Sequence, residues 1–259
     1  MMDFTNEYFD LMETSFRLSQ SKPLNCISIS TMTFIADLGV TIDIESLNKN
    51  FTSTTYPICS IKRTKKHHEY ETTKRGKKKL SFYNQITITY VDHTTKSIKI
   101  FSNGRLQMTG ITSLNEAKYA ANTIIQIIKN SVDSEADINA SKFEIALINS
   151  NFSFKNNLNI VKLRPLIKDC KVEYKPDVYP GLKIKHNSTG ASIFLFSTGN
   201  VVITGVKSLT SIREAFTHIT NNVFDNYETI KLPYVAPVKI KQLPVIKNGY
   251  AIAEYDAAS

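Results

Sequence analysis

Apolar residues recur along this chain in two rhythms, and each rhythm is found twice. Alternation of apolar with polar residues is typical of strands that bury one face, and it predicts strands at 97–101 and 192–196. Further extended segments are predicted at 27–35, 82–91, 143–154 and 182–186. Spacings of three and four residues predict two long amphipathic helices, each with one buried face. The positions expected to be buried are Leu114, Ala117, Ala121, Ile124 and Ile128, and Leu209, Ile212, Phe216, Ile219 and Val223. Two short helices are expected at about 43–50 and 158–168.

An internal repeat organises these elements. FSNGRLQMTGITSL at 101–114 returns as FSTGNVVITGVKSL at 196–209, at an offset of 95 residues, with seven of fourteen positions identical. In both copies a strand runs into a Ser-x-Gly turn, where glycine adopts the conformation of a tight hairpin without steric cost. Strand, short helix, strands and long helix occur twice in this order. The sequence therefore predicts an α+β fold in which two half-domains share one antiparallel sheet, related by a pseudo-twofold axis, with helices on one face.

The repeat divides the chain into four parts. These are an N-terminal extension (1–26), a first repeat (27–130), a second repeat (142–227) and a C-terminal tail (228–259). Four-residue steps predict an amphipathic helix in the extension, formed around Phe4, Tyr8, Met12 and Phe16. Three prolines in the tail predict an extended chain there.

Positive charge is concentrated in one segment of the first repeat. The chain carries a formal net charge of +9, and residues 62–79, with nine cations and two glutamates, account for +7. Such a patch is typical of a site for a polyanion. The alternative is a solvated loop that binds nothing. The run Lys74–Lys79 also resembles a nuclear localisation signal.

Several function classes find no support. No run of 18 or more apolar residues predicts a membrane span. The three cysteines are far apart and odd in number, which favours a reducing compartment. His67–His68 lacks the further ligands of a metal site. Cys170 follows Asp169 but no histidine is placed by the sequence to activate it, so a buried structural thiol is expected. We therefore expect no enzyme, no metal and no cofactor.

The duplicated motif resembles the TATA-box-binding protein family. The shared features are Phe-Ser-x-Gly followed by Thr-Gly in each half, and Tyr-Lys-Pro-Asp-Val-Tyr-Pro-Gly-Leu at 174–182. The resemblance covers about 27–227 and is to a divergent member, of the kind that a large DNA virus or an AT-rich eukaryote encodes. It implies a saddle whose curved sheet carries helices on its convex face and whose concave face binds and bends DNA through the minor groove.

The resemblance also assigns aromatic residues that insert between base steps, two in each half. They are Phe82, Phe101, Tyr179 and Phe196. The first assignment has an alternative, because Tyr56-Pro57 echoes Tyr179-Pro180 but lies 45 residues before Phe101, whereas Phe82 lies 19 before it. Phe82 is preferred because it begins a strong strand pattern.

Further positions follow from the same resemblance. The minor-groove floor is assigned to Thr33, Gln107, Thr109, Leu147, Val202 and Thr204. The paired asparagines of the family fall near Thr31 and Thr33, and near Ile145 and Leu147, where this chain has none. Phosphate contacts are assigned to Arg105, Lys185 and Lys207. On this alignment the basic segment 62–79 is an insertion just before the strand that begins at Phe82, and its Lys74, Arg75, Lys77, Lys78 and Lys79 are expected to lie beside DNA phosphates or a partner factor. Gln107 in one half against Val202 in the other predicts loose specificity, with more tolerance of G·C pairs in the first half.

The function expected from the resemblance is transcription initiation without catalysis. The expected partners are AT-rich double-stranded DNA, a factor-IIB-like protein and RNA polymerase. The protein would bind DNA as a monomer, in the nucleus or in a viral factory or virion. The alternative is an interaction scaffold that keeps the saddle but has lost specific DNA binding.

Overall fold

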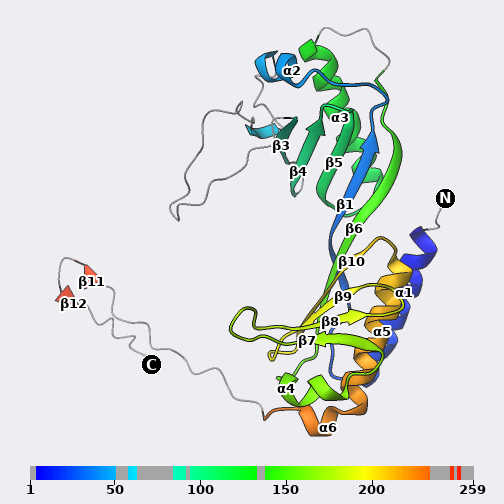
Figure 1. The fold of residues 1–259 in the computed structure, drawn as a ribbon, viewed down its shortest axis with the longest axis vertical. Coiled ribbons are helices and arrows are strands. Elements are labelled where there is room, and N and C mark those ends of the chain that lie inside the picture. The colour runs from blue at the N-terminus through cyan, green and yellow to red at the C-terminus, as the bar shows by residue number, and fades with distance from the viewer. Residues whose placement is uncertain are drawn as a thin grey trace, which may run out of the picture.

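The computed structural model describes residues 4–50, 58–62, 84–91, 94–132, 138–233, 246–247 and 250–251. Its centre is one ten-stranded antiparallel sheet that curves into an arc (Figure 1), with the order β2-β3-β4-β5-β1-β6-β10-β9-β8-β7. The strands are β1 Ser28–Asp37, β2 Ile58–Lys62, β3 Gln85–Val91, β4 Thr95–Phe101, β5 Arg105–Ile111, β6 Ser141–Ser153, β7 Cys170–Glu173, β8 Leu182–His186, β9 Ser192–Leu195 and β10 Asn200–Val206. A separate hairpin joins β11 Ile246–Lys247 and β12 Tyr250–Ala251.

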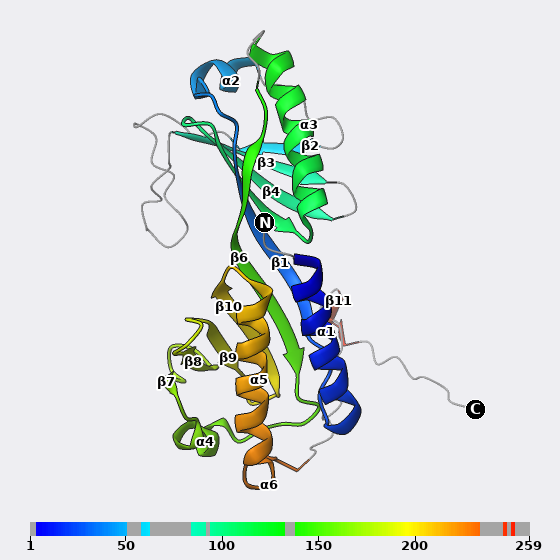
Figure 2. The ribbon, with the colours of Figure 1, turned by 90° about the vertical axis from the view of Figure 1, so that its right-hand side faces the viewer.

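The long helices lie on the convex side of the arc (Figure 2). The helical elements are α1 Phe4–Ser21, α2 Ile44–Asn50, α3 Leu114–Val132, α4 Ile160–Leu163, the 3₁₀ turn η1 Arg164–Leu166, α5 Leu209–Asp225 and α6 Tyr227–Ile230. Alternate strand residues and one stripe of each long helix enclose the core between the two layers. Of the ten helix positions predicted to be buried, nine are buried and only Leu114 is half-buried.

The strand order has a pseudo-twofold axis between β1 and β6, which pair at the centre of the sheet. Moving outward, β5 matches β10, β4 matches β9, β3 matches β8 and β2 matches β7. The helices α3 and α5 follow β5 and β10 in the same way. The expected α+β saddle, in which two repeats share one sheet, is confirmed.

One predicted helix is much shorter in the structure. The segment 158–168 contains only the four-residue α4 and then η1. Asn159 caps α4, because its side-chain oxygen accepts a hydrogen bond from the Lys162 amide at 3.0 Å. Pro165 prevents the α-helical hydrogen bonds from continuing, because proline has no amide hydrogen to donate, and the chain passes into the 3₁₀ turn η1.

The N-terminal helix α1 packs against α5 of the second repeat, although it precedes the first repeat in the chain (Figure 2). Leu11 is fully buried in this contact. The Glu7 carboxylate accepts hydrogen bonds from the amides of Leu209 at 3.0 Å and Thr210 at 3.3 Å. These amides begin α5 and have no partner within the helix. Glu7 therefore caps α5 and places a negative charge at the positive end of its dipole.

We expect Glu7→Ala to lower the free energy of unfolding by about 1–2 kcal/mol, because it removes both the cap and the favourable charge. Urea unfolding measures this change. The matched control is Glu13→Ala on the same helix, whose side chain is 67% exposed and faces Arg17 at 3.9 Å. An exposed pair of this kind contributes little. Equal losses for the two variants would show that Glu7 is not a cap.

The first repeat anchors α3 through a buried ion pair. Lys96 on β4 is 1% exposed, and its ammonium lies 2.6 Å from a Glu116 carboxylate oxygen on α3. The other oxygen accepts hydrogen bonds from the Thr112 amide and hydroxyl, at 2.6 and 2.8 Å. At the matching positions the second repeat has Ala191 and Ser211. The two halves therefore fix their long helices by different chemistry.

Candidate nucleic-acid interface

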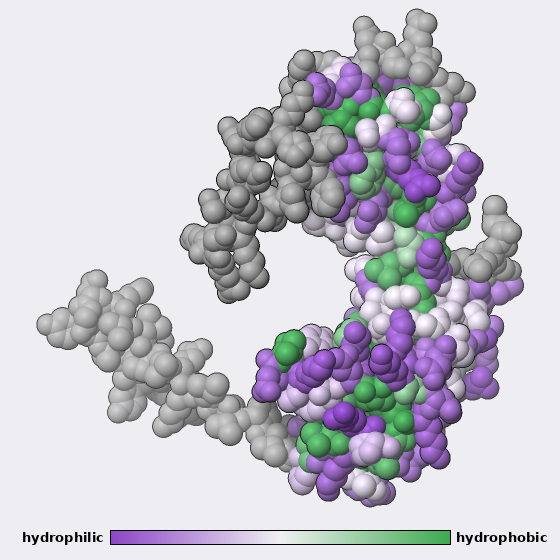
Figure 3. Space-filling model, in the orientation of Figure 1, coloured by the Kyte–Doolittle hydropathy of each residue, from purple (hydrophilic) through white to green (hydrophobic). Residues whose placement is uncertain are grey.

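The concave face of the sheet is not covered by any helix among the described residues (Figures 1 and 2). Its side chains alternate with buried core residues: Gln107, for example, lies between Leu106 and Met108, which are both fully buried. The space-filling view shows that the molecule is hollowed on this side, between the two repeats (Figure 3). This surface is the one that a ligand seated in the arc would meet.

Two glycines of the repeated motif are required by close backbone approach. Gly104 and Gly199 have φ of +79° and +83°. A Cβ at Gly104 would lie 1.9 Å from the Val40 carbonyl oxygen, and one at Gly199 would lie 2.3 Å from the Phe154 carbonyl oxygen. The turn after Phe101 therefore packs closely against the β1–α2 connection, and the turn after Phe196 packs closely against the β6–α4 connection. The end of each strand is held in place on the arc.

Aromatic rings gather at the outer end of the second repeat. Phe196 follows β9 and is half-buried, and Tyr179, in the β7–β8 connection, is 43% exposed. The Tyr179 ring contacts Phe196 edge-on, with centroids 5.8 Å apart, and Phe194, at 5.5 Å. A Cβ at Gly181 would lie 2.8 Å from the Tyr179 ring and 3.0 Å from the Phe196 ring. Tyr179 and Phe196, predicted from the sequence, are therefore adjacent, and Phe194 joins them.

In the first repeat, Phe101 ends β4 at the position that matches Phe196 and is also half-buried. Phe82 and its alternative Tyr56 lie outside the described residues. The two alternatives precede different strands. Tyr56 precedes β2, whereas Phe82 precedes β3, and β3 is the counterpart of β8, the strand that follows Tyr179.

The floor residues predicted near the centre come together across β1 and β6. Thr33 is the Cα partner of Leu147 on one side and of Thr109 on the other. The hydroxyls of Thr33 and Thr109 lie 3.4 Å apart. Ile145 is different: a register shift pairs it with Phe34, which is buried on the helix face. The placement of Ile145 near the floor is therefore wrong, because the irregularity in β6 turns its side chain to the convex face.

Asn149 is a floor residue that sequence reasoning missed. It lies on β6 opposite Thr31, and its amide nitrogen donates to the Thr31 hydroxyl at 3.0 Å. Its amide oxygen accepts from the Thr204 hydroxyl. One amide thus joins a residue of the first repeat to one of the second at the pseudo-twofold axis. The register of β1 against β6, which the sequence does not state, was needed to find it.

Further out, the floor differs between the halves. On β4 and β5, Lys99 is the cross-strand partner of Gln107. On β9 and β10, Phe194 is the partner of Val202. Both members of the first pair are 95 residues before those of the second, so the pairs occupy equivalent positions. Lys99 and Phe194 were not predicted, although extending the repeat comparison two residues toward the N-terminus aligns them.

The predicted cations do not form one group. Arg105 is exposed at the start of β5, and Lys185 lies on β8, where its ammonium donates to the Gly190 carbonyl and lies 3.4 Å from the Ser192 hydroxyl. Lys207 follows β10 and lines a pocket of about 650 Å³ with Ser208 at the start of α5. The basic-segment residues from Lys74 to Lys79 lie outside the described residues.

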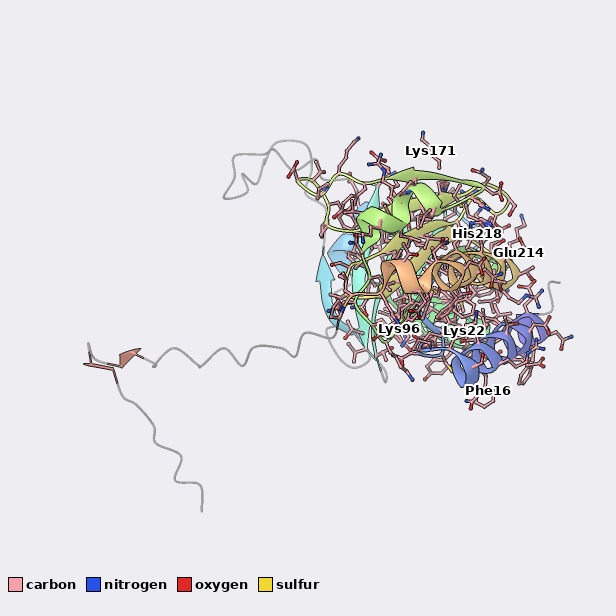
Figure 4. All side chains as sticks on the ribbon, turned by 90° about the horizontal axis from the view of Figure 1, so that it is seen from below. Phe16, Lys22, Lys96, Lys171, Glu214 and His218 are labelled. Atoms are coloured by element: carbon pink, nitrogen blue, oxygen red, sulfur yellow. The ribbon has the colours of Figure 1, made fainter. Side chains whose placement is uncertain are left out.

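Two more lysines share the face of Lys185. Lys171 pairs with Lys185, and Lys183 pairs with Glu173, across β7 and β8. Figure 4 shows Lys171 projecting from the edge of the sheet. The sequence has no long basic run in β7 or β8. Lys171 and Lys183 could be found only from the alternation of exposed and buried residues along these strands.

Cys170 has a histidine neighbour that the sequence did not predict. Its sulfur lies 3.2 Å from His218 Nε2 on α5, and the thiol is half-buried (Figure 4 labels His218). The expectation of a buried cysteine with no histidine placed near it is therefore wrong, because the fold brings His218 of α5 to the half-buried Cys170. Burial raises the pKa of the Cys170 thiol, and burial together with His218 lowers the pKa of His186. A protonated thiol is a poor nucleophile, so this cluster does not indicate catalysis.

The described residues provide neither a metal site nor a membrane-spanning helix. None of their His, Cys, Asp and Glu side chains form a group of three or more that could hold a metal ion. None of their helices is both long and apolar enough to cross a membrane.

Comparison with known proteins identifies the family. The profile described as "Transcription factor TFIID (or TATA-binding protein, TBP)" matches residues 142–225. A "TATA-box-binding protein-like" relative from Acanthamoeba polyphaga mimivirus is 30% identical over 270 residues, which cover 87% of this chain and 73% of the relative. The chain belongs to the TATA-box-binding protein family. This membership places it among transcription factors and confirms the resemblance carried by the repeated motif.

Other TATA-box-binding proteins agree. "TATA-box-binding protein 3" of Methanosarcina mazei is 29% identical over 140 residues, covering 52% of this chain and 72% of that protein. The solved "Methanococcus jannaschii TBP" has a TM-score of 0.54 and 21% identity, covering 77% of this chain and 98% of its own. At this identity the structure supports the TATA-box-binding protein fold alone.

Proposed function

We propose that this chain is a transcription initiation factor that binds double-stranded DNA in its concave face, enters the minor groove and bends the duplex. The observation that carries the proposal is the cluster of Tyr179, Phe194 and Phe196 at the end of a concave sheet face that no described helix covers (Figure 1). Apolar rings that open base steps from the minor groove are a known device for kinking DNA, for which TATA-box-binding proteins are the standard example.

The rest of the concave face has chemistry that suits the same ligand. Small neutral side chains such as Thr33, Thr109 and Thr204 line its centre. Cations on the flanking strands can contact phosphates, which supply most of the affinity of such proteins but little specificity. The described cations that flank the floor are Arg105, Lys171, Lys183 and Lys185.

The aromatic residue at the outer end of the first repeat remains a proposal. Ile88 and Ile184 occupy matching positions in β3 and β8, which gives an offset of 96 residues. Counting by that offset from Tyr179 leads to Tyr83, immediately after the predicted Phe82. We therefore assign the inserting role to this aromatic pair and expect both residues to be needed in any test of the first repeat.

The proposed protein partners are a factor-IIB-like protein and RNA polymerase. The β7–β8 connection, which resembles the family's contact with factor IIB, has Lys175 and Asp177 where the family has two glutamates. The Lys175 ammonium lies 2.6 Å from Glu173, and this hydrogen bond and charge lower the pKa of the Glu173 carboxyl. A partner adapted to this altered charge pattern is expected. The chain would act as a monomer without a cofactor, because the internal repeat takes the place of a dimer.

An interaction scaffold is the second candidate function. Gln107 and Lys99 place polar groups on a floor that is apolar in the other half, and the family's paired asparagines are absent. A scaffold would keep the saddle and its convex helices while losing specific DNA binding. The retained aromatic cluster favours the first candidate.

Gel-shift titration of AT-rich and GC-rich duplexes at 50 and 200 mM salt tests the proposal. We expect tighter binding to the AT-rich duplex, and about a 150-fold loss of its affinity between the two salt concentrations if the four cations that flank the floor contact phosphates. Lys183→Gln should flatten the salt slope by about 0.9. Lys118→Gln, on the exposed surface of α3, is the matched control and should leave the slope unchanged. Absence of DNA binding at 50 mM salt would favour the scaffold.

A further inference from the structure

The two halves of the concave floor offer different chemistry at equivalent positions. Lys99 and Gln107 face each other across β4 and β5, where Phe194 and Val202 face each other across β9 and β10. All four side chains are half-buried, so each packs against its neighbours on the sheet and is also accessible to a ligand in the hollow. The next cross-strand pair on the same face is identical in the two halves, Ser97 with Thr109 and Ser192 with Thr204.

The polar pair has no partner in the part of the chain that the structure describes. Lys99 forms no ion pair there, and neither Lys99 nor Gln107 has a side-chain hydrogen bond there. The equivalent Phe194 ring is packed against Tyr179, with centroids 5.5 Å apart. The second half therefore presents a fixed apolar platform, whereas the first presents an ammonium and a carboxamide whose hydrogen-bonding groups face the hollow.

These groups match different edges of the minor groove. Every base pair shows acceptors there, and G·C pairs add the guanine amino donor. The Gln107 carboxamide can accept from that amino group, and the Lys99 ammonium can donate to the acceptors that all pairs share. Phe194 and Val202 offer no acceptor. A guanine amino group pressed against them would lose its water without a replacement, which is unfavourable.

We propose that Lys99 and Gln107 are specificity-determining residues that admit G·C pairs under the first repeat, while Phe194 and Val202 restrict the second repeat to A·T pairs. This rests on the proposed DNA-binding function. The preferred DNA site is then a composite of an A·T half and a half of mixed composition. Because the two halves of such a site differ, the saddle binds it in one orientation and so defines a direction along the duplex.

The experiment exchanges the two pairs. A randomised duplex selection with the full chain should return a site with one strict A·T half and one permissive half. Lys99→Phe with Gln107→Val copies the second half into the first and should make both halves A·T-specific. Phe194→Lys with Val202→Gln does the reverse and should make both halves permissive. Each G·C pair moved from a permissive to a strict half should cost about 5- to 100-fold in affinity.

Two controls keep the result clear. Lys99→Met with Gln107→Met removes the polar groups without bulky rings, and it stands in if the first exchange fails to fold in a thermal melt. Lys118→Gln removes a convex-face charge and should leave the selected site unchanged. A wild-type selection that returns two equally strict halves, or exchanged variants that select the wild-type site, would overturn the inference while leaving DNA binding intact. Failure of the wild-type chain to bind any duplex would overturn the proposed function as well.

Discussion

Phe196→Ala should lower DNA affinity and bending by at least about tenfold while the melting temperature changes little. The ring is half-buried at the end of a strand, so its removal exposes or empties little of the core. Unstacking a base step costs a few kcal/mol, and only a ring that stacks on the opened bases offsets that cost. Phe101→Ala should behave in the same way, because it occupies the matching position in the first repeat.

Thermal melting and a fluorescence bend assay, made on the same samples, separate this outcome from a core role. The matched control is Phe216→Ala on α5, which removes the same side chain from a fully buried site. We expect that control to lose about 3–5 kcal/mol of stability. If Phe196→Ala melts as early as the control, yet bends DNA normally while folded, then the ring is a core residue and the assignment of the concave face is wrong.

Glu116→Gln should cost about 3–5 kcal/mol of unfolding free energy, because it leaves the buried Lys96 ammonium without its counter-charge. Lys96→Met should cost less, since Glu116 is 21% exposed and keeps hydrogen bonds from Thr112. The double variant Lys96→Met with Glu116→Gln should recover much of the loss, because no unpaired charge remains in the core. Urea unfolding of the three variants measures these differences. A double variant as unstable as Glu116→Gln would contradict the ion-pair explanation.

The same pair gives the stability a dependence on acid. Burial alone would raise the pKa of Glu116, but the hydrogen bonds from Lys96 and Thr112 outweigh it, so the pKa lies below its ordinary value. A carboxyl with a lowered pKa stabilises the fold fully above its unfolded value of about 4.3. That contribution is lost as the pH falls through the lower, folded value. Glu116→Gln should therefore flatten the acid limb of the stability profile.

The sequence predicted the sheet and the long helices well because two independent signals agreed. The spacing of Ile212, Phe216 and Ile219 predicted the buried stripe of α5, and the duplicated Phe-Ser-x-Gly motif predicted where each hairpin turns. Resemblance then gave the family, and with it the saddle. These features depend on local pattern, which a single sequence carries.

Other features depend on register and on contacts across the fold. Asn149 lies on the floor only because β6 pairs with β1 through several register shifts, and one of these turns Ile145 to the helix face. The contact of Cys170 with His218 joins residues 48 positions apart. Local alternation gives each residue a face, but it does not say which residue lies opposite. For this reason the pairing of Lys99 with Gln107 also became visible only in the structure.

The central pairing of β1 and β6 acquires a mechanical meaning if a bent duplex occupies the arc. Bent DNA acts as a spring that tends to straighten, and it would push the two ends of the saddle apart. That load is greatest at the middle of the arc, where the two longest strands, of 10 and 13 residues, run side by side. The long ladder of backbone hydrogen bonds between β1 and β6 distributes this load over many bonds. The saddle can therefore keep its ligand bent without a rigid cluster of side chains at its centre.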